Sequence, residues 1–257
     1  MCVSLYVTGW KWHGGVLAPD GCIYAFPSHA PRVLKIDCMA GTVKQIGPEF
    51  EGRYKWGGGA VGLDGNVYGM PSDIDVVLRI NCATEEVDTI GHGKLPSYKN
   101  KWQGAVLAPD GALYAIPGDA DSVLKIVPET GEVSLVGQVG DAPDKWQGGF
   151  LGEDGIIYGI PENADQILRI IPPKVTKEGL SQVKAAAAAS GAAAVGAVPA
   201  AAQATVQKSG VAPEAVVKGV GAVVGEPSTS FMENMGLMVV AGGILIAAAL
   251  ILRARRT

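Results

Sequence analysis

Short apolar runs separated by Gly, Pro and Asp recur along the first two thirds of the chain, and they predict β-strands. In the first unit, residues 14–18 form an apolar run that ends at a Pro-Asp-Gly turn, and residues 22–26 form a second run that ends at Pro27. Residues 33–36 and 43–46 alternate apolar and polar side chains, which is typical of strands with one buried face. The unit therefore predicts four short antiparallel strands.

This unit occurs four times, with its tryptophans at intervals of 44, 46 and 44 residues. The recurring positions are Trp12, Trp56, Trp102 and Trp146; Asp20, Asp64, Asp110 and Asp154; Tyr24, Tyr68, Tyr114 and Tyr158; Pro27, Pro71, Pro117 and Pro161; and Lys35, Arg79, Lys125 and Arg169. Four antiparallel strands in each unit of this length are typical of a β-propeller blade. The sequence thus predicts an all-β fold, a propeller of four four-stranded blades over residues 1–173.

The two ends of the repeat predict how the ring closes. The fourth unit reaches Pro172 without a fourth strand of its own, while residues 2–7 resemble the fourth strand at residues 133–136. We expect the N-terminal strand to complete the last blade, because this pairing removes an exposed strand edge. The alternative is that residues 1–173 are a fragment of a longer array that needs other blades to fold, in which case a strand edge would be exposed.

The composition changes after the repeats. Residues 174–230 are rich in Ala, Val, Gly and Pro and contain no aromatic side chain, which predicts a flexible or partly helical stalk. Residues 231–257 contain an uncharged apolar stretch at 236–252, followed by an Arg-rich end. Its 17 residues span roughly 25 Å as a helix, close to the short limit for a bilayer core of about 30 Å. We expect a single transmembrane helix here rather than a buried helix, which an all-β body does not need.

The orientation of this predicted membrane anchor follows from the N-terminus. Residues 1–15 lack the basic and apolar regions of a signal peptide, so we expect a tail-anchored protein whose propeller is cytosolic. The alternative is export of the propeller with the arginines in the cytosol, as the positive-inside rule favours. Neither the organelle nor the oligomeric state follows from the sequence.

Charge and cysteine usage exclude several classes of protein. The net charge of −4 argues against a nucleic-acid binder that depends on phosphate contacts. Four cysteines without a C-x-x-C motif, and three histidines without an H-E-x-x-H motif, exclude a disulfide scaffold and a zinc ribbon and leave little for a metalloenzyme. Cys38 and Cys82 occupy equivalent places in adjacent units, too far apart for a disulfide, which favours a reducing compartment.

The repeated pattern K-W-x-G-G…D-G-x-I-Y-x-I-P…V-L-x-I resembles the propeller repeat of a little-characterised group of algal and protist proteins. It is more distantly similar to kelch, NHL and gluconolactonase-like propellers, and the resemblance covers residues 1–173. It departs from kelch because the Gly pair follows Trp closely and the Tyr-to-Trp spacing of kelch is missing. The resemblance implies a propeller and transfers no activity.

Gluconolactonase-like propellers hold a divalent metal near the axis with Glu, Asn and Asp side chains, as the resemblance implies. The corresponding inner strands of this chain provide His13, Gln103 and Gln147 but no carboxylate, so no metal or other cofactor is expected. The chain also lacks a G-x-S-x-G motif and a phosphate-binding loop. We therefore expect no catalytic residues and a membrane-anchored, non-catalytic scaffold that binds a protein or ligand. The alternative is a propeller enzyme or ligand sensor whose site lies in the blade-top loops.

Lysines precede the four tryptophans and form the first candidate site. A closed ring would place them around one circle, where they could bind a small acidic ligand or an acidic protein partner. The alternative, which we favour, is that the lysine stems cover the Trp faces with solvated ammonium groups, and that the tryptophans form the core between blades. The candidate binding residues are Lys11, Lys55, Lys101, Lys145, Trp12, Trp56, Trp102 and Trp146.

Acidic loops follow three of the four repeat prolines, at residues 72–75, 118–121 and 162–165. Their Asp-rich sequences could supply oxygen ligands to Ca²⁺, but no recognised calcium-binding loop is completed. We expect them to act in turns, with Asp side chains accepting backbone N–H bonds.

Overall fold

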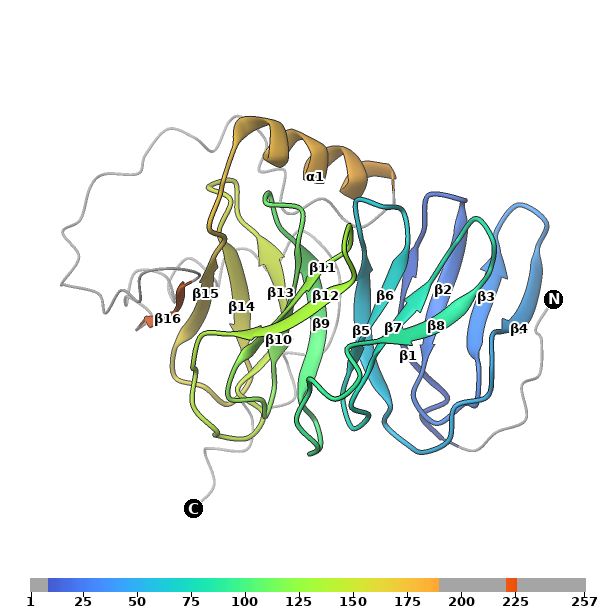
Figure 1. The fold of residues 1–257 in the computed structure, drawn as a ribbon, viewed down its shortest axis with the longest axis horizontal. Coiled ribbons are helices and arrows are strands. Elements are labelled where there is room, and N and C mark those ends of the chain that lie inside the picture. The colour runs from blue at the N-terminus through green and yellow to red at the C-terminus, as the bar shows by residue number, and fades with distance from the viewer. Residues whose placement is uncertain (1–8, 190–220, 226–257) are drawn as a thin grey trace, which may run out of the picture. The chain divides into compact units, whose positions relative to one another are not determined.

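The computed structural model describes residues 9–189 and 221–225, which contain four antiparallel sheets of four strands each (Figure 1). The first sheet consists of β1 (Trp12–Leu17), β2 (Cys22–Pro27), β3 (Val33–Asp37) and β4 (Thr42–Ile46). The second consists of β5 (Trp56–Val61), β6 (Val67–Pro71), β7 (Val77–Ile80) and β8 (Val87–Ile90). The third consists of β9 (Trp102–Leu107), β10 (Leu113–Pro117), β11 (Val123–Val127) and β12 (Glu132–Val136). The fourth consists of β13 (Trp146–Leu151), β14 (Ile157–Pro161), β15 (Ile167–Ile171) and β16 (Gly221–Gly225). The all-β fold with four repeated four-stranded sheets is confirmed.

The fourth strand of the last sheet differs from the expected one. β16 pairs antiparallel with β15, with Leu168 opposite Val224. The edge of β15 is thus occupied by a segment of the predicted stalk instead of residues 2–7, which lie outside the described residues. The physical reason is that an edge strand accepts any extended segment that can complete its ladder of hydrogen bonds. The Gly-Ala-Val-Val-Gly sequence of β16 contains two β-branched residues suited to this conformation.

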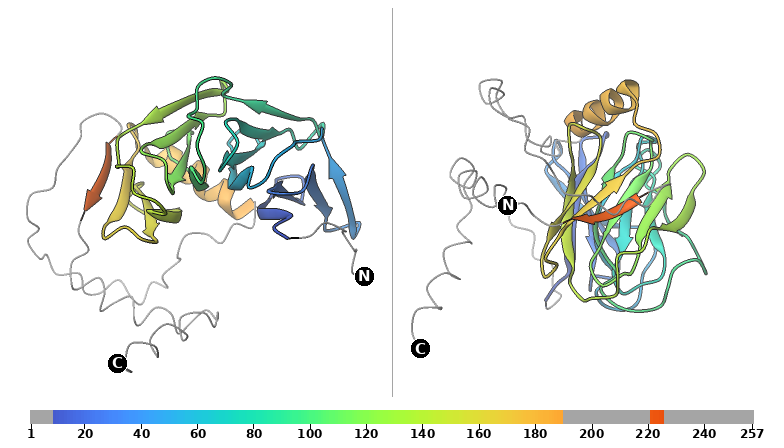
Figure 2. Two further views of the ribbon diagram at one scale, coloured as in Figure 1. Left: turned by 90° about the horizontal axis from the view of Figure 1, so that it is seen from below. Right: turned by 90° about the vertical axis from the view of Figure 1, so that its left-hand side faces the viewer.

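The sheets follow one another along an open arc in the described part of the chain, with the first and fourth sheets at its two ends (Figure 2). The inner strands β1, β5, β9 and β13 contact one another in this order. They approach closely at glycines: a Cβ atom at Gly14 would lie 3.2 Å from the Cα atom of Gly58. The predicted closed ring is therefore not what the described residues form.

Each sheet contains the same hydrogen bond from the repeat Tyr to the Asp of the Asp-Gly turn, which explains the spacing of the sequence repeat, and in the first and third sheets a lysine also binds this Asp. In the first sheet, the Tyr24 hydroxyl donates to Asp20 Oδ2 over 2.7 Å, and the backbone N–H of Cys22 donates to Asp20 Oδ1 over 3.1 Å. Lys35 lies opposite Tyr24 in the β2–β3 pairing, with its ammonium group 3.3 Å from Asp20 Oδ2. The Asp-Gly turn is thus tied to both neighbouring strands. The recurrence of the Asp–Tyr bond in every sheet marks it as structural.

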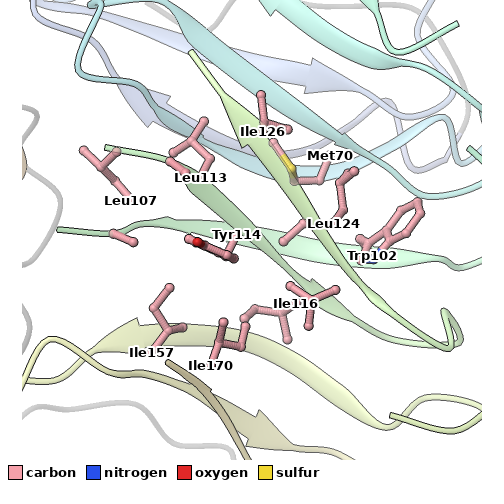
Figure 3. Close-up of a cluster of buried hydrophobic side chains, with 14 of the residues drawn as sticks. Met70, Trp102, Leu107, Leu113, Tyr114, Ile116, Leu124, Ile126, Ile157 and Ile170 are labelled. Carbon is pink, nitrogen blue, oxygen red and sulfur yellow. The ribbon is translucent and has the colours of Figure 1, made fainter. Parts of the chain in front are cut away.

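The hydrophobic core lies between the sheets. Figure 3 shows Trp102, Tyr114 and Leu124 of the third sheet with Met70 of the second sheet on one side and Ile170 of the fourth on the other. All five of these side chains are fully buried. Each sheet therefore depends on its neighbours for its core, as in other repeat proteins.

Helix α1 (Lys177–Ala189) belongs to this folded body, although its sequence lies in the predicted stalk. Val183 is buried in the core, and Leu180 packs against it. A Cβ atom at Gly179 would lie 2.0 Å from the carbonyl oxygen of Pro109, so glycine permits the close approach of the helix to the Pro-Asp-Gly turn after β9. The body thus extends beyond residue 173, the expected boundary.

The predicted membrane helix at residues 236–252 lies outside the described residues. Within residues 9–189 and 221–225, no helix has both the length and the apolar character needed to cross a membrane.

Candidate binding face

The structure buries three of the four candidate lysines between successive sheets. Lys55, Lys101 and Lys145 are 1%, 0% and 3% exposed. The ammonium group of Lys55 donates to the carbonyl oxygens of Ser28 (2.9 Å) and Ala30 (3.0 Å) of the preceding sheet. Burial lowers the pKa of all three lysines. These three lysines do not form an exposed ring. Their ammonium groups are also not solvated, contrary to our expectation for lysine stems that cover the tryptophans, because the preceding sheet covers them.

The tryptophans that follow these lysines are also interior. Trp56, Trp102 and Trp146 are at most 1% exposed. Each indole N–H donates to a backbone carbonyl of its own sheet, for example from Trp102 to Ser122 over 2.9 Å. These three indoles belong to the core between sheets. Lys11 and Trp12 are half-buried, because they lie at the end of the arc, where no sheet of the described residues covers them. A role of these eight residues in ligand binding stays a prediction.

A different repeated position presents its side chains at the ends of the inner strands. The residue two places before each repeat tryptophan adopts left-handed backbone geometry, with φ of 23° at Trp10, 50° at Tyr54, 53° at Asn100 and 49° at Asp144. Residues other than glycine rarely adopt this conformation, and it costs about 1–3 kcal/mol where neighbouring structure imposes it. In every sheet the carbonyl oxygen of this residue accepts a bond from the second residue after the repeat proline, for example from Asp73 to Tyr54 over 2.9 Å.

Side chains from the loops after the repeat prolines reach across to these left-handed residues. Asp73 Oδ1 accepts the backbone N–H of Asn100 (2.9 Å), and Asp119 Oδ1 accepts that of Asp144 (2.7 Å). The acidic loops at residues 72–75 and 118–121 therefore do accept backbone N–H bonds, but from the following sheet. His29 occupies the position of Asp73 and Asp119 in the first sheet, and its ring contacts the ring of Tyr54 with centroids 4.4 Å apart. We call these eight positions the rim: Trp10, His29, Tyr54, Asp73, Asn100, Asp119, Asp144 and Asn163.

The rim changes from aromatic to polar along the arc. At the first sheets, Trp10 is 61% and Tyr54 46% exposed, and their ring centroids lie 6.3 Å apart. At the later sheets, the side-chain amide of Asn100 donates to Asp119 Oδ1 (3.0 Å) and Asp144 Oδ1 (2.6 Å). The rim therefore combines an exposed apolar surface with a cluster of carboxylates.

His29 is a half-buried titratable group at the aromatic end of the rim. Its Nε2 atom is buried without a hydrogen-bond partner among the described residues. Burial, followed by the positive charges of Arg53 and Lys55, lowers the pKa of His29 below its ordinary value of 6.5. The imidazole is thus neutral at pH 7 and contributes an aromatic surface rather than a charge.

The inner strands place His13 and Gln103 in contact with rim residues, and Gln147 occupies the same position as Gln103 in β13. His13 contacts the ring of Trp10 with centroids 5.9 Å apart, and the Gln103 amide donates to Asn100 Oδ1 over 2.6 Å. Among the described residues, no group of three or more His, Cys, Asp or Glu side chains could hold a metal ion.

Sequence reasoning missed most of the rim. A usable signal was present, because the position two places before each tryptophan differs in every repeat (Trp, Tyr, Asn and Asp), whereas its neighbours Lys and Trp are invariant. A position that varies between otherwise matching units indicates a role that differs from the shared structural one.

The fold is similar to that of known β-propeller proteins. Virginiamycin B lyase from Staphylococcus aureus matches with a TM-score of 0.54 and 17% sequence identity, over 65% of this chain and 54% of that chain. A streptogramin B lyase structure matches with a TM-score of 0.52 and 17% identity, over 65% of this chain and 54% of that chain. At this identity the likeness shows the fold alone.

This chain spans about half the length of the lyase structures that it matches. No model of a protein family and no curated protein matches the sequence. The comparisons therefore establish a propeller-like fold of repeated four-stranded sheets, and they transfer no activity.

Proposed function

We propose that the chain is a non-catalytic binding scaffold that recognises a protein partner through the rim. The observation that carries this proposal is the combination at the rim of two exposed aromatic rings, Trp10 and Tyr54, with the cluster around Asn100. Tyr and Trp supply much of the binding energy of protein interfaces, because they bury a large area and lose little conformational entropy.

The chemistry of the rim indicates what kind of partner it binds. Asp73, Asp119 and Asp144 provide carboxylate acceptors, whereas the cations Lys55, Lys101 and Lys145 are buried within the body. A basic or hydroxyl-bearing protein segment with an adjacent apolar side chain fits this arrangement, since carboxylates accept bonds from such donors. The small acidic ligand expected from an exposed lysine ring is not part of the proposal.

The proposal includes a membrane anchor at residues 236–252, with the propeller in the cytosol. Its support is the uncharged, apolar sequence of this segment, which is long enough to reach across most of a bilayer core. Extraction of membranes with alkaline carbonate should leave the protein in the pellet, and release into the soluble fraction would refute the anchor. Protease added to sealed membranes should digest the propeller, and protection until detergent is added would refute the cytosolic orientation.

The rim is tested by selecting binding peptides from a random displayed library on the full chain. Their affinity is then measured for the Trp10→Gly and Tyr54→Gly variants, because glycine adopts the left-handed backbone without strain. The control is Met39→Gly, which removes a 93% exposed apolar side chain from the turn between β3 and β4. We expect at least tenfold weaker binding for either rim variant, about 1.4 kcal/mol, and unchanged binding for the control. Peptides that bind all of these proteins equally would refute the rim as the binding face.

A further inference from the structure

The three contacts between successive sheets share one construction, which we call the junction. The residue before each repeat proline inserts its side chain into the next sheet: Phe26, Met70 and Ile116 are each 0% exposed. Small residues receive it. A Cβ atom at Gly69 would lie 2.8 Å from Phe26 Cδ1, and one at Gly149 would lie 2.8 Å from Ile116 Cδ1.

The backbone of the junction is equally regular. The N–H of the repeat lysine donates to the residue after the repeat proline of the preceding sheet, from Lys55 to Ser28 (3.3 Å) and from Lys145 to Gly118 (3.1 Å). At the middle junction, the Lys101 ammonium group also binds Asp75 Oδ1 at 3.0 Å. Each junction thus consists of an apolar side chain in a small-residue pocket, a backbone bond and a lysine.

The last sheet carries one half of a junction without the other half. Ile160 occupies the position of Phe26, Met70 and Ile116, yet it is 43% exposed. Pro161 and Glu162, whose counterparts in the other three sheets are buried, are exposed as well. Within the described residues, nothing from another sheet covers this end.

The first sheet carries the complementary half. Gly15 occupies the position of Gly59 and Gly149; it is exposed, and the nearest atoms to a Cβ placed there belong to Tyr24 and Ala25 of its own sheet. The pocket that receives a side chain elsewhere in the array is thus open here. Lys11, the lysine of this sheet, is only half-buried.

The two free halves match each other. The pocket of the first sheet is formed by Gly15 and Ala25, so it is slightly smaller than the pockets formed by two glycines. The side chain of Ile160 is correspondingly smaller than that of Phe26, which fills one of the two-glycine pockets. Asp165 corresponds in the repeat to Asp75, the carboxylate bound by Lys101, and it is exposed. Lys11 is therefore equipped to bind Asp165, as Lys101 binds Asp75.

We propose that the fourth sheet of one chain docks onto the first sheet of a second copy through a fourth junction, with Ile160 in the pocket of Gly15 and Ala25. Both surfaces are present on every chain, so the contact is head-to-tail and joins two copies into a ring or a series of copies into a filament. The size of the lyase propellers supports a pair, because the matched part of this chain covers 54% of one such chain. The inference does not depend on the binding role of the rim.

The test measures the mass of the full chain, purified in detergent micelles, by light scattering over a series of concentrations. We expect the protein mass to rise from 26.4 kDa to twice that value or higher multiples. Ile160→Ser should weaken association at least tenfold, whereas Leu135→Ser, which alters a 40% exposed apolar side chain of the third sheet, should not. Circular dichroism verifies that both variants are folded. A wild-type protein with the mass of one chain at every concentration would overturn the proposal.

A charge exchange distinguishes this contact from association through another surface, such as the apolar segment at residues 236–252. Lys11→Glu and Asp165→Lys should each weaken association, and the double variant should restore it, because both exchanged charges meet in every head-to-tail contact. Association that persists in the Ile160→Ser variant and in both charge variants would overturn the proposal, since it would require a different surface.

Discussion

The junctions predict that equivalent isoleucines contribute unequally to stability. Ile116 is fully buried between the third and fourth sheets, whereas Ile160, at the same repeat position, is 43% exposed at the end of the arc (Figure 3 shows Ile116). Replacement of each by Ala removes the same atoms from two environments. The comparison therefore isolates the effect of a neighbouring sheet.

The magnitude follows from burial. Truncation of a buried Ile to Ala costs about 2–5 kcal/mol, because it removes apolar contacts and leaves a cavity. We expect about 3 kcal/mol for Ile116→Ala, since the glycines that surround the side chain cannot fill the space. For Ile160→Ala we expect about 1.4 kcal/mol, because the change removes three carbon atoms at roughly 0.8 kcal/mol each, reduced by the exposed fraction of 43% and without a cavity.

The assay is urea unfolding followed by tryptophan fluorescence, with dilute protein so that association does not contribute. Trp146, at the same junction as Ile116, is 1% exposed and reports its opening. Ile116→Val serves as the control and should cost about 0.5–1.5 kcal/mol, because most of the side chain remains. Equal losses for Ile116→Ala and Ile160→Ala would refute the reasoning, since the fourth sheet would then have a neighbour that the structure does not show.

Three further predictions concern single side chains. Burial and its aspartate acceptor raise the pKa of Tyr114 above 10, so its contribution to stability is complete below pH 10 and is lost as pH rises further; Tyr114→Phe should flatten this alkaline loss in pH-dependent unfolding. Gly179→Ala should lower stability by about 1–3 kcal/mol through a clash between helix α1 and the third sheet, whereas Ser181→Ala on the exposed side of the helix should be neutral in thermal unfolding. Lys101→Met should cost about 1–3 kcal/mol in urea unfolding, because the carbonyl oxygen of Tyr98 loses its donor; an unchanged midpoint would show that the buried ammonium group is not needed.

The strands and turns could be predicted from the sequence alone, because the residues that recur in each unit form hydrogen bonds with neighbours close in the sequence. Asp20 binds the backbone and the Tyr24 hydroxyl within four residues, so a fixed spacing in the sequence corresponds to a fixed geometry. The same is true of Pro27, which ends β2. These contacts need no knowledge of the rest of the chain.

Features that depend on neighbouring sheets could not be predicted in this way. The burial of Lys55 depends on the carbonyl oxygens of Ser28 and Ala30, whose direction only the three-dimensional arrangement defines. β16 lies some 50 residues beyond β15 in the sequence, and nothing in its composition marks it as the partner of that strand. The left-handed backbone at Trp10 and Tyr54 likewise carries no residue signature, because the surrounding turn imposes it.

A crystal structure of the full chain would test most directly whether the same junction that joins successive sheets also joins the fourth sheet of one copy to the first sheet of another. In this crystal structure we expect β16 to pair with β15 and Ile160 of one copy to fill the pocket formed by Gly15 and Ala25 of another. Ile160 covered by its own chain, or residues 2–7 paired with β15, would contradict this expectation.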